Sequence, residues 1–182
     1  WLGTAPERSY APEIYHPSKW RAWQDFGTGW PGDIGCHVFD ATWKALNLTA
    51  PKTVHATVQD SWKNSKDRRA DTWPQSDHIT WTFPGSPITE KNELTIEWFD
   101  GLIYPPEEAQ KWYPGKTYPP ESALIVGTEG AVLIPNGGGA MLLPRDKYKG
   151  TPQPKLDTRN HYHHFLDAII GKAKNESYFE QT

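Results

Sequence analysis

The chain has 182 residues, a length typical of one domain. Its net charge is -3 and 23% of its residues are charged, so nothing in the charge balance points to a nucleic acid or an anionic membrane as partner. The single cysteine excludes an intramolecular disulfide framework, and no apolar run approaches the ~20 residues of a membrane-spanning helix.

Residues 1–32 predict an ordered loop rich in aromatic side chains. Prolines and glycines recur along this segment and interrupt any regular period. Flexible linkers are not aromatic-rich, so we expect the segment to lie over the domain or to lead into a site. Trp20, Trp23 and Trp30 lie near its glycine-rich end, where they either line a cleft and stack on sugar rings or pack in the interior.

Gly27 to Gly32 match the spacing G-x-G-x-x-G of dinucleotide-binding loops. The residues before Gly27 are not a buried hydrophobic strand, and Trp30 and Pro31 occupy the turn. No acidic residue stands about 20 positions further on, where a ribose partner is expected. We therefore interpret the segment as a sharp turn into a helix, which can still bring backbone close to a ligand.

The apolar periodicity of residues 33–46 predicts a helix with Asp33 at its N-cap or in its first turn. Two neighbouring apolar stripes predict that the helix is buried over most of its circumference. The stripes consist of Ile34, Val38, Ala41 and Ala45, and of Cys36, Phe39, Trp43 and Leu46. The narrow polar stripe that remains must face water or a cavity.

Asp33, His37 and Asp40 are the strongest candidates for chemistry in that polar stripe. Spacings of four and seven residues place the three side chains on one helical face. A histidine exchanges protons near neutral pH, and a carboxylate one turn away can orient its ring or bind a substrate hydroxyl. A capping aspartate followed by a polar helix surface has the same spacing and is the more frequent arrangement.

The middle of the chain predicts β-structure, because β-branched and aromatic residues alternate with polar ones. Strands are predicted at residues 53–58, 78–83, 94–99, 123–126, 131–134 and 141–143. A long polar loop is predicted at residues 60–77, and Gly127–Gly130 is typical of a hairpin turn.

Residues 160–170 predict a second helix, with Asn160 as its cap and Gly171 at its end. Its apolar face consists of Tyr162, Phe165, Leu166 and Ile169. The run His161–His164 does not predict a metal site, because zinc needs three or four convergent ligands. The two glycosylation sequons, at Asn47 and Asn175, are of a kind that is frequent by chance.

The order of a helix, several strands and a helix predicts an α+β fold with a mainly antiparallel sheet. The sequence also contains the block Gly-Asp-x-Gly-x-His-x-x-Asp at residues 32–40 and further blocks at residues 1–8, 15–17, 20–21, 25–29, 97–101, 127–130 and 163–169. Together these blocks resemble the C-terminal half of Gfo/Idh/MocA-type oxidoreductases. The block at residues 32–40 is the most specific.

The resemblance implies an enzyme of two domains. In this family an N-terminal Rossmann domain binds NAD or NADP and supplies a lysine from a Glu-Lys-Pro motif. Residues 1–182 would be a single substrate-binding and oligomerisation domain, with the Rossmann domain expected upstream of Trp1. The family fold is an open-faced, mainly antiparallel sheet with helices on one face, like the C-terminal domain of glyceraldehyde-3-phosphate dehydrogenase. It implies a homodimer or homotetramer that associates through the sheet face.

The resemblance also implies roles for individual residues. His37 would donate or accept a proton during hydride transfer, and Asp33 would bind and orient a substrate hydroxyl. Contacts to a sugar, polyol or related hydroxy compound are expected from Trp20, Arg21, Asp40 and His164. By itself the chain is expected to be inactive and to bind neither cofactor nor metal.

Two other functions stay open at this stage. Some family members use NAD to cleave glycosidic bonds, and a stand-alone carbohydrate-binding module would need only the tryptophans. Trp30-Pro31 and Leu102 depart from the small residues that are common in the resembling sequences, which leaves the substrate open. The lone cysteine suits the cytoplasm, but an upstream export signal would lead to the periplasm.

Overall fold

The structure is a computed structural model that describes residues 2–152, 154–155 and 158–175. Trp1 of the N-terminal block and Glu176-Ser177 of the second sequon lie outside these residues. The chain divides into two compact units, residues 1–149 and 150–182, and each is described by itself. The assignment of residues 1–182 to one domain stays a prediction.

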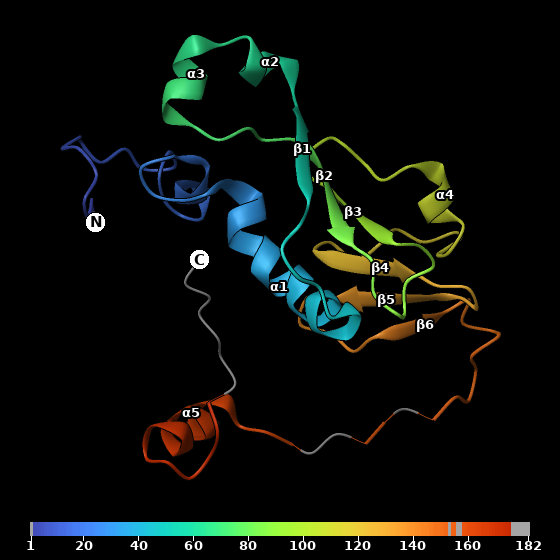
Figure 1. Cartoon of the computed structure of the whole chain (residues 1–182). Coiled ribbons are helices and arrows are strands. Elements are labelled where there is room, and N and C mark those ends of the chain that lie inside the picture. The colour runs from blue at the N-terminus through green and yellow to red at the C-terminus, as the bar shows by residue number, and fades with distance from the viewer. Residues whose placement is uncertain (1, 153, 156–157, 176–182) are drawn as a thin grey trace. The chain divides into compact units, whose positions relative to one another are not determined.

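The first long element of the larger unit is helix α1, Gly29–Leu46 (Figure 1). It begins before the predicted start at Asp33, and its N-cap residue is Thr28. Pro31 stands in the first turn, where its missing N–H costs no helical hydrogen bond, so Trp30 and Pro31 belong to the helix. The prediction that Asp33 caps or opens the helix is therefore wrong, because Asp33 lies beyond the first turn.

Burial of α1 is narrower than the two apolar stripes predicted. Ile34 and Val38 are buried, whereas Cys36, Ala41 and Trp43 are exposed. The prediction of burial over most of the circumference is wrong, because a helix against one sheet face buries a single stripe. The polar stripe is consequently part of a broader exposed surface.

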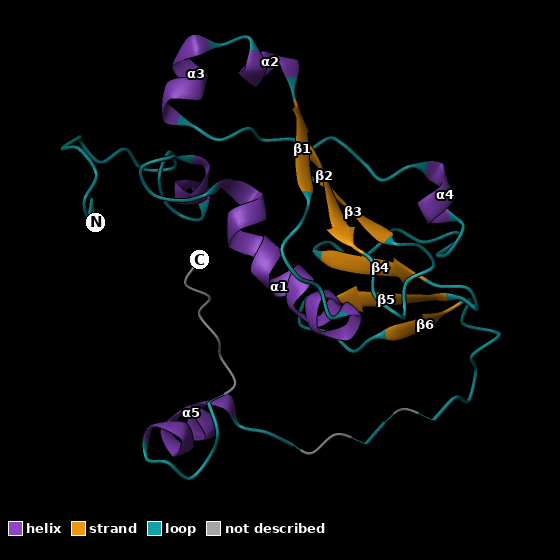
Figure 2. Ribbon diagram, in the orientation of Figure 1, coloured by secondary structure: helices purple, strands orange, loops and turns teal. Residues whose placement is uncertain are grey.

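Three strands pair antiparallel in the order β1-β2-β3 (Figure 2). They are β1 (Thr53–Val58), β2 (Asp77–Pro84) and β3 (Glu93–Phe99), which confirms the first three predicted strands. Helix α1 packs on one face of this sheet through edge-to-face aromatic pairs. The Phe39 ring centroid lies 5.1 Å from that of Trp81, and the Trp43 centroid lies 5.7 Å from that of Phe83.

The connection between β1 and β2 contains two short helices, α2 (Asp60–Lys63) and α3 (Lys66–Asp71). The prediction of a loop throughout residues 60–77 is thus wrong in part. Ser65 caps α3, since its hydroxyl accepts the Arg68 N–H at 3.3 Å. Helices of this length show little apolar periodicity, which is why the sequence pattern did not indicate them.

A second antiparallel sheet has the strand order β4-β5-β6. Its strands are β4 (Ser122–Val126), β5 (Ala131–Pro135) and β6 (Met141–Leu143), and the short helix α4 (Glu107–Gln110) precedes them. The predicted hairpin is confirmed, with the Gly127 N–H donating to the Gly130 carbonyl at 2.8 Å. Leu133 and Leu143 are fully buried in this sheet, and Trp112, Tyr113 and Tyr118 pack around them.

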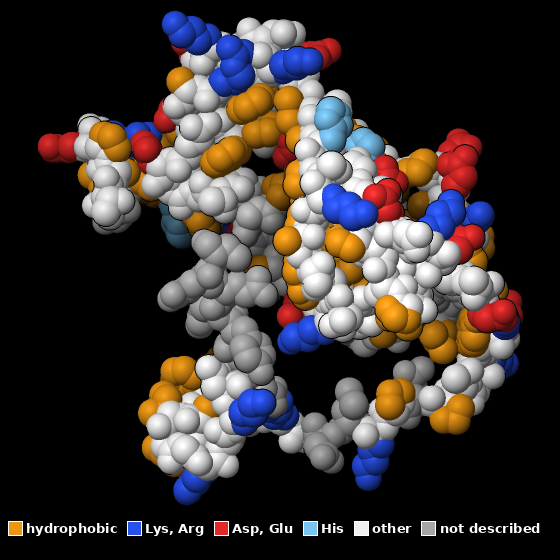
Figure 3. Space-filling model, in the orientation of Figure 1, with side chains coloured by type: hydrophobic (Ala, Val, Ile, Leu, Met, Phe, Trp, Pro, Cys, Tyr) orange, Lys and Arg blue, Asp and Glu red, His pale blue; other side chains and the backbone are white. Residues whose placement is uncertain are grey.

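The smaller unit contains helix α5 (His161–Ile169). The Asn160 side chain accepts the His163 N–H at 3.0 Å, and Gly171 takes a positive φ of 75°, so the predicted cap and end are confirmed. The predicted apolar face is exposed in this unit, where hydrophobic side chains lie at the surface (Figure 3). Its members Tyr162, Phe165, Leu166 and Ile169 are between 56% and 70% exposed.

The described residues form an α+β fold with two three-stranded antiparallel sheets and five α-helices. The predicted α+β class and antiparallel pairing are confirmed, and the strands divide between two sheets. Within the described ranges, no helix combines the length and the apolar character needed to cross a membrane.

Candidate functional site

The candidate site lies where the N-terminal segment turns into α1. Arg21 belongs to the 3-10 helix η1 (Lys19–Ala22), which precedes the turn. Trp73 holds the turn, because its Nε1 donates to the Gly27 carbonyl at 2.7 Å. Gly29 has a φ of 73°, and a Cβ added to it would lie 3.3 Å from the Trp73 Cβ. The turn thereby brings Arg21 and α1 together.

An ion pair joins the two elements at the centre of the site. Arg21 Nε donates to Asp33 Oδ2, and Arg21 also donates to the Ser18 carbonyl. The Arg21 guanidinium carbon lies 5.0 Å from the Trp20 ring centroid and 5.1 Å from the Trp30 centroid. Cation–π contacts of this kind contribute about 0.5–2 kcal/mol each. Three predicted site residues, Trp20, Arg21 and Asp33, are thus in contact.

Both ionic side chains are sheltered, while the two indoles remain accessible. The side chains of Arg21 and Asp33 are 20% and 23% exposed. Trp20 and Trp30 are 39% and 38% exposed. The arrangement can hold a carboxylate in a fixed orientation beside apolar ring surface, which is what recognition of a hydroxyl-bearing ligand requires.

His37 lies one helical turn beyond Asp33, and its side chain is exposed. Its ring is accessible to a ligand that also reaches Asp33. Cys36, next to it, is exposed, and its Sγ lies 3.6 Å from the Asp33 carbonyl. The described residues contain no group of three or more His, Cys, Asp or Glu side chains placed to hold a metal ion.

Asp40 is less closely tied to the site. Its carboxylate pairs with Lys44 at 3.2 Å, and both side chains are well exposed. Exposed pairs of this spacing contribute about 0.3–0.5 kcal/mol. The structure thus shows Asp40 in a surface pair two helical turns from Asp33, where only a larger substrate would reach it.

His164 lies in α5 of the smaller unit and is half-buried there. Its backbone N–H donates to the Asn160 carbonyl at 2.9 Å, so it is part of the first turn of that helix. Because each unit is described by itself, the predicted substrate contact from His164 stays a prediction.

The glycines of the G-x-G-x-x-G match do not fit the pyrophosphate of NAD or NADP. Residues 24–28 are turn and loop rather than a strand. A Cβ on Gly27 would lie 2.7 Å from the Arg21 Cα, and one on Gly32 would overlap the Thr28 side chain. The chain's own atoms therefore fill the space that a dinucleotide loop leaves for phosphate oxygens.

Asp77 and Asp100 form a second titratable group, which sequence reasoning missed. Asp77 is 5% exposed, and its backbone N–H donates to Asp100 Oδ1 at 2.6 Å. Trp98 Nε1 donates to Asp100 Oδ2 at 2.8 Å. Burial, and then the neighbouring Asp100 carboxylate, raise the pKa of Asp77 to about 7. The sequence signal that could have indicated this group is an acidic residue, Asp77, at the start of an apolar strand.

Sequence reasoning did not predict the support that Trp73 gives to this site. The indole is 46 residues from Gly27 in the chain, and no local period links the two.

Comparison of the chain with protein-family models and with curated proteins finds no match. The function is accordingly inferred from the geometry of the site and the motif resemblance.

Proposed function

We propose that the chain is the substrate-binding domain of an oxidoreductase that acts on a sugar, a polyol or a related hydroxy compound. The observation that carries this proposal is the Arg21–Asp33 pair, which lies between two accessible indoles and one turn from His37. Together these groups supply a hydroxyl acceptor, an apolar surface for a ring and an exchangeable proton.

More specifically, we propose the C-terminal domain of a Gfo/Idh/MocA-type enzyme, with a fold like that of the glyceraldehyde-3-phosphate dehydrogenase C-terminal domain. Support comes from the block at residues 32–40 and from a helix, α1, packed on one face of an antiparallel sheet. Since the loop at residues 27–32 does not fit a dinucleotide, NAD or NADP would be held by a Rossmann domain outside this chain.

In this proposal, different residues of the chain bind the substrate and transfer the proton. Arg21 holds Asp33 Oδ2, so the carboxylate keeps one orientation. Asp33 Oδ1, which no described residue hydrogen-bonds, would accept a substrate hydroxyl. His37 would then exchange a proton with the oxygen on the reacting carbon.

A sugar-binding module is the second candidate, and the exposed indoles of Trp20 and Trp30 favour it. Such a module would bind sugar by itself and would have no catalytic use for His37. An NAD-dependent glycosidase of the same family would share the substrate site of the first candidate. The oxidoreductase and the sugar-binding module are distinguished by whether the intact protein reduces NAD or NADP.

The 182-residue chain should bind a hexose or cyclic polyol and should not turn over NAD. Trp30→Ala should weaken D-glucose or myo-inositol binding about tenfold, because loss of ring contact costs about 1.4 kcal/mol. Titration of tryptophan fluorescence measures the affinity, with Tyr104→Ala, an exposed aromatic outside the site, as control. Absence of binding, or equal weakening by both variants, would contradict the proposed site.

The upstream reading frame tests the enzyme class. We expect a strand, G-x-G-x-x-G and a helix, followed before Trp1 by Glu-Lys-Pro. The protein encoded by the whole frame should reduce NAD or NADP in the presence of a sugar or polyol. An unrelated domain in that place would favour the carbohydrate-binding module.

We also propose that the chain forms a homodimer or homotetramer through the sheet face opposite α1. Because side chains alternate across a strand, the pairing register defines that face. It carries Thr53, His55, Thr57, His78, Thr80, Thr82, Thr95, Glu97 and Phe99. His78 stacks on Phe99 with ring centroids 4.5 Å apart and contacts Glu97 at 2.9 Å. Figure 3 shows histidine side chains at the surface near β1.

Light scattering on the chain should give two or four times its monomer mass. Thr80→Arg puts an unpaired charge at the centre of the proposed interface and should shift the protein to monomer. Thr128→Arg, at the exposed hairpin tip, should leave the mass unchanged. A monomeric wild-type chain, or an oligomer indifferent to Thr80→Arg, would contradict the interface.

A further inference from the structure

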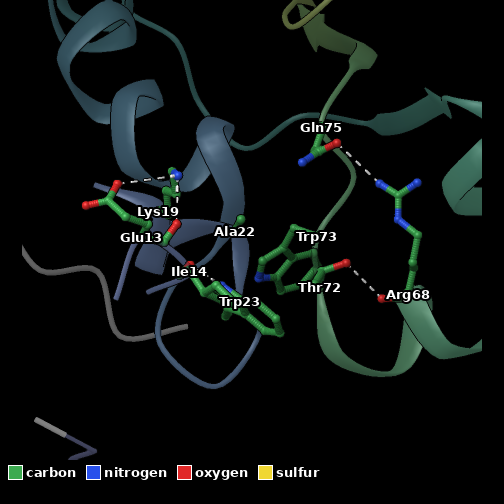
Figure 4. A pocket seen from close by; sticks show the side chains of 9 residues that line it. All are labelled: Glu13, Ile14, Lys19, Ala22, Trp23, Arg68, Thr72, Trp73 and Gln75. Carbon is green, nitrogen blue, oxygen red and sulfur yellow. Dashed lines mark hydrogen bonds and ion pairs between the residues drawn. The ribbon is translucent and has the colours of Figure 1, made fainter. Parts of the chain in front are cut away.

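A pocket of about 280 Å³ opens in the larger unit between the N-terminal segment and the segment from α3 to β2. Figure 4 shows Glu13 with Lys19 at one end, Arg68 with Gln75 at the other, and Trp23 and Trp73 between them. Trp20, Arg21, Asp33 and His37 do not line it. The pocket is therefore distinct from the candidate site on α1.

Backbone contacts hold the two indoles that form the middle of the pocket. Trp23 Nε1 donates to the Ile14 carbonyl at 3.2 Å, and Trp23 forms an isolated β-bridge with Thr72. The Trp73 N–H donates to the Ala22 carbonyl at 2.7 Å, and its Nε1 is bonded to Gly27. Both indole N–H groups are thus satisfied, and the rings contribute apolar surface to a preformed pocket.

The two ends of the pocket differ in their electrostatics. Lys19 is bonded to Glu13, with Nζ 2.7 Å from the Glu13 carbonyl and 3.9 Å from its Oε2. Arg68 donates to Ser61 Oγ at 3.2 Å and to Gln75 Oε1 at 3.4 Å. Within the described part of the chain, no carboxylate forms an ion pair with Arg68. A guanidinium has five N–H donors, so donors remain for an anion at this end.

We propose that this pocket binds a single-ring sugar acid, with the ring against Trp23 and Trp73 and the carboxylate on Arg68. Sites for larger ligands occupy about 300–1,000 Å³, so a volume of about 280 Å³ suits one ring. Lys19 Nζ has three N–H donors, and the Glu13 carboxylate and the Thr72 hydroxyl, which itself donates to the Arg68 carbonyl at 3.0 Å, can accept from ring hydroxyls. An aromatic acid lacks the hydroxyls that would use these groups, which favours a sugar acid.

Ligand-observed NMR and fluorescence titration of the 182-residue chain with D-glucuronate test this site. We expect saturable binding, and at least tenfold weaker binding of D-glucose at the same pocket because it lacks the carboxylate. Arg68→Gln should weaken D-glucuronate binding at least tenfold. Arg69→Gln makes the same charge change on α3, at a residue that does not line the pocket, and should leave binding unchanged.

Near-ultraviolet circular dichroism tests whether both arginine variants keep the tryptophan environment of the wild type. If the Arg68→Gln variant loses that signal, the Arg68→Lys variant is tested in its place. We then expect a weakened but measurable affinity for D-glucuronate. Absence of saturable D-glucuronate binding would overturn the proposal, as would equal effects of the Arg68 and Arg69 variants. The Trp30→Ala result bears on the α1 site alone, so failure of one site is distinguishable from failure of the other.

Discussion

In the intact form of the proposed oxidoreductase, replacing His37 by alanine should lower kcat roughly 10²-fold or more. General acid–base catalysis by a positioned side chain contributes about 10²–10⁴-fold, and alanine leaves no group to exchange the substrate proton. The exposed position of His37 on α1 means that the substitution should leave the fold intact. Steady-state kinetics with the preferred sugar or polyol, across a range of pH, measures the effect.

Lys44→Ala on the same helix is the matched control for His37→Ala. Lys44 is exposed and loses only its pair with Asp40, so kcat should stay within about twofold of wild type. An unchanged kcat would remove His37 from the reaction, and a raised KM with unchanged kcat would make it a binding residue.

Replacing Asp77 by asparagine should stabilise the protein at pH 8 by an amount on the order of 2–4 kcal/mol. Asp77 is buried beside the Asp100 carboxylate, so its ionised form is disfavoured in the folded state. The pKa of Asp77 is about 7 when folded, against an ordinary value of 3.8. Each unit of difference is worth about 1.4 kcal/mol, and local relaxation lowers the total.

The sign of this effect follows from proton uptake. Below about pH 4, Asp77 is protonated in both states and contributes no pH dependence. Between about pH 4 and 7 the folded state keeps a proton that the unfolded state has lost, so the contribution of Asp77 to stability falls as pH rises. Above about pH 7, Asp77 is ionised in both states, and its contribution to stability falls no further. Asparagine cannot ionise, so the stability difference between variant and wild type should grow across this window.

Urea unfolding at intervals from pH 4.5 to 8 measures that difference. Asp146→Asn, at an exposed position after β6, is the control and should differ from wild type by a constant amount at all pH values. A difference between Asp77→Asn and wild type that does not change with pH would contradict the raised pKa of Asp77. A variant less stable than wild type at pH 8 would show that the carboxylate makes a favourable contact.

The strands were predictable because their signal is local. Alternation of β-branched and polar residues in β1 defines a pleated segment without knowledge of its partner. The start of α1 was not predictable in the same way, since Trp30-Pro31 reads equally as a turn or as a first helical turn. In the structure these two residues form the first helical turn, and contacts from Trp73, far away in the chain, accompany that conformation.

The candidate site was likewise predictable only where its residues lie close together in the sequence. Spacing alone puts Asp33 and His37 on one face of a helix, and it also places Asp40 there. Spacing also accounts for the Asp40–Lys44 pair, because residues four apart are neighbours on a helix, but it does not show that Arg21 reaches across a turn to Asp33. The Arg21–Asp33 pairing depends on backbone direction between two elements, which no helical period encodes.

By itself the sequence determined the α+β class, the strands, the second helix with its Asn160 cap, and the common face of Asp33 and His37. Each of these depends on residues within a few positions of one another, whose side chains and backbone interact before any tertiary contact forms. Only the tertiary structure decided the Arg21–Asp33 pair, the burial of Asp77 beside Asp100, and the pocket between Trp23 and Arg68. Those features join segments that local periodicity treats as independent, because packing of the whole chain sets their distances.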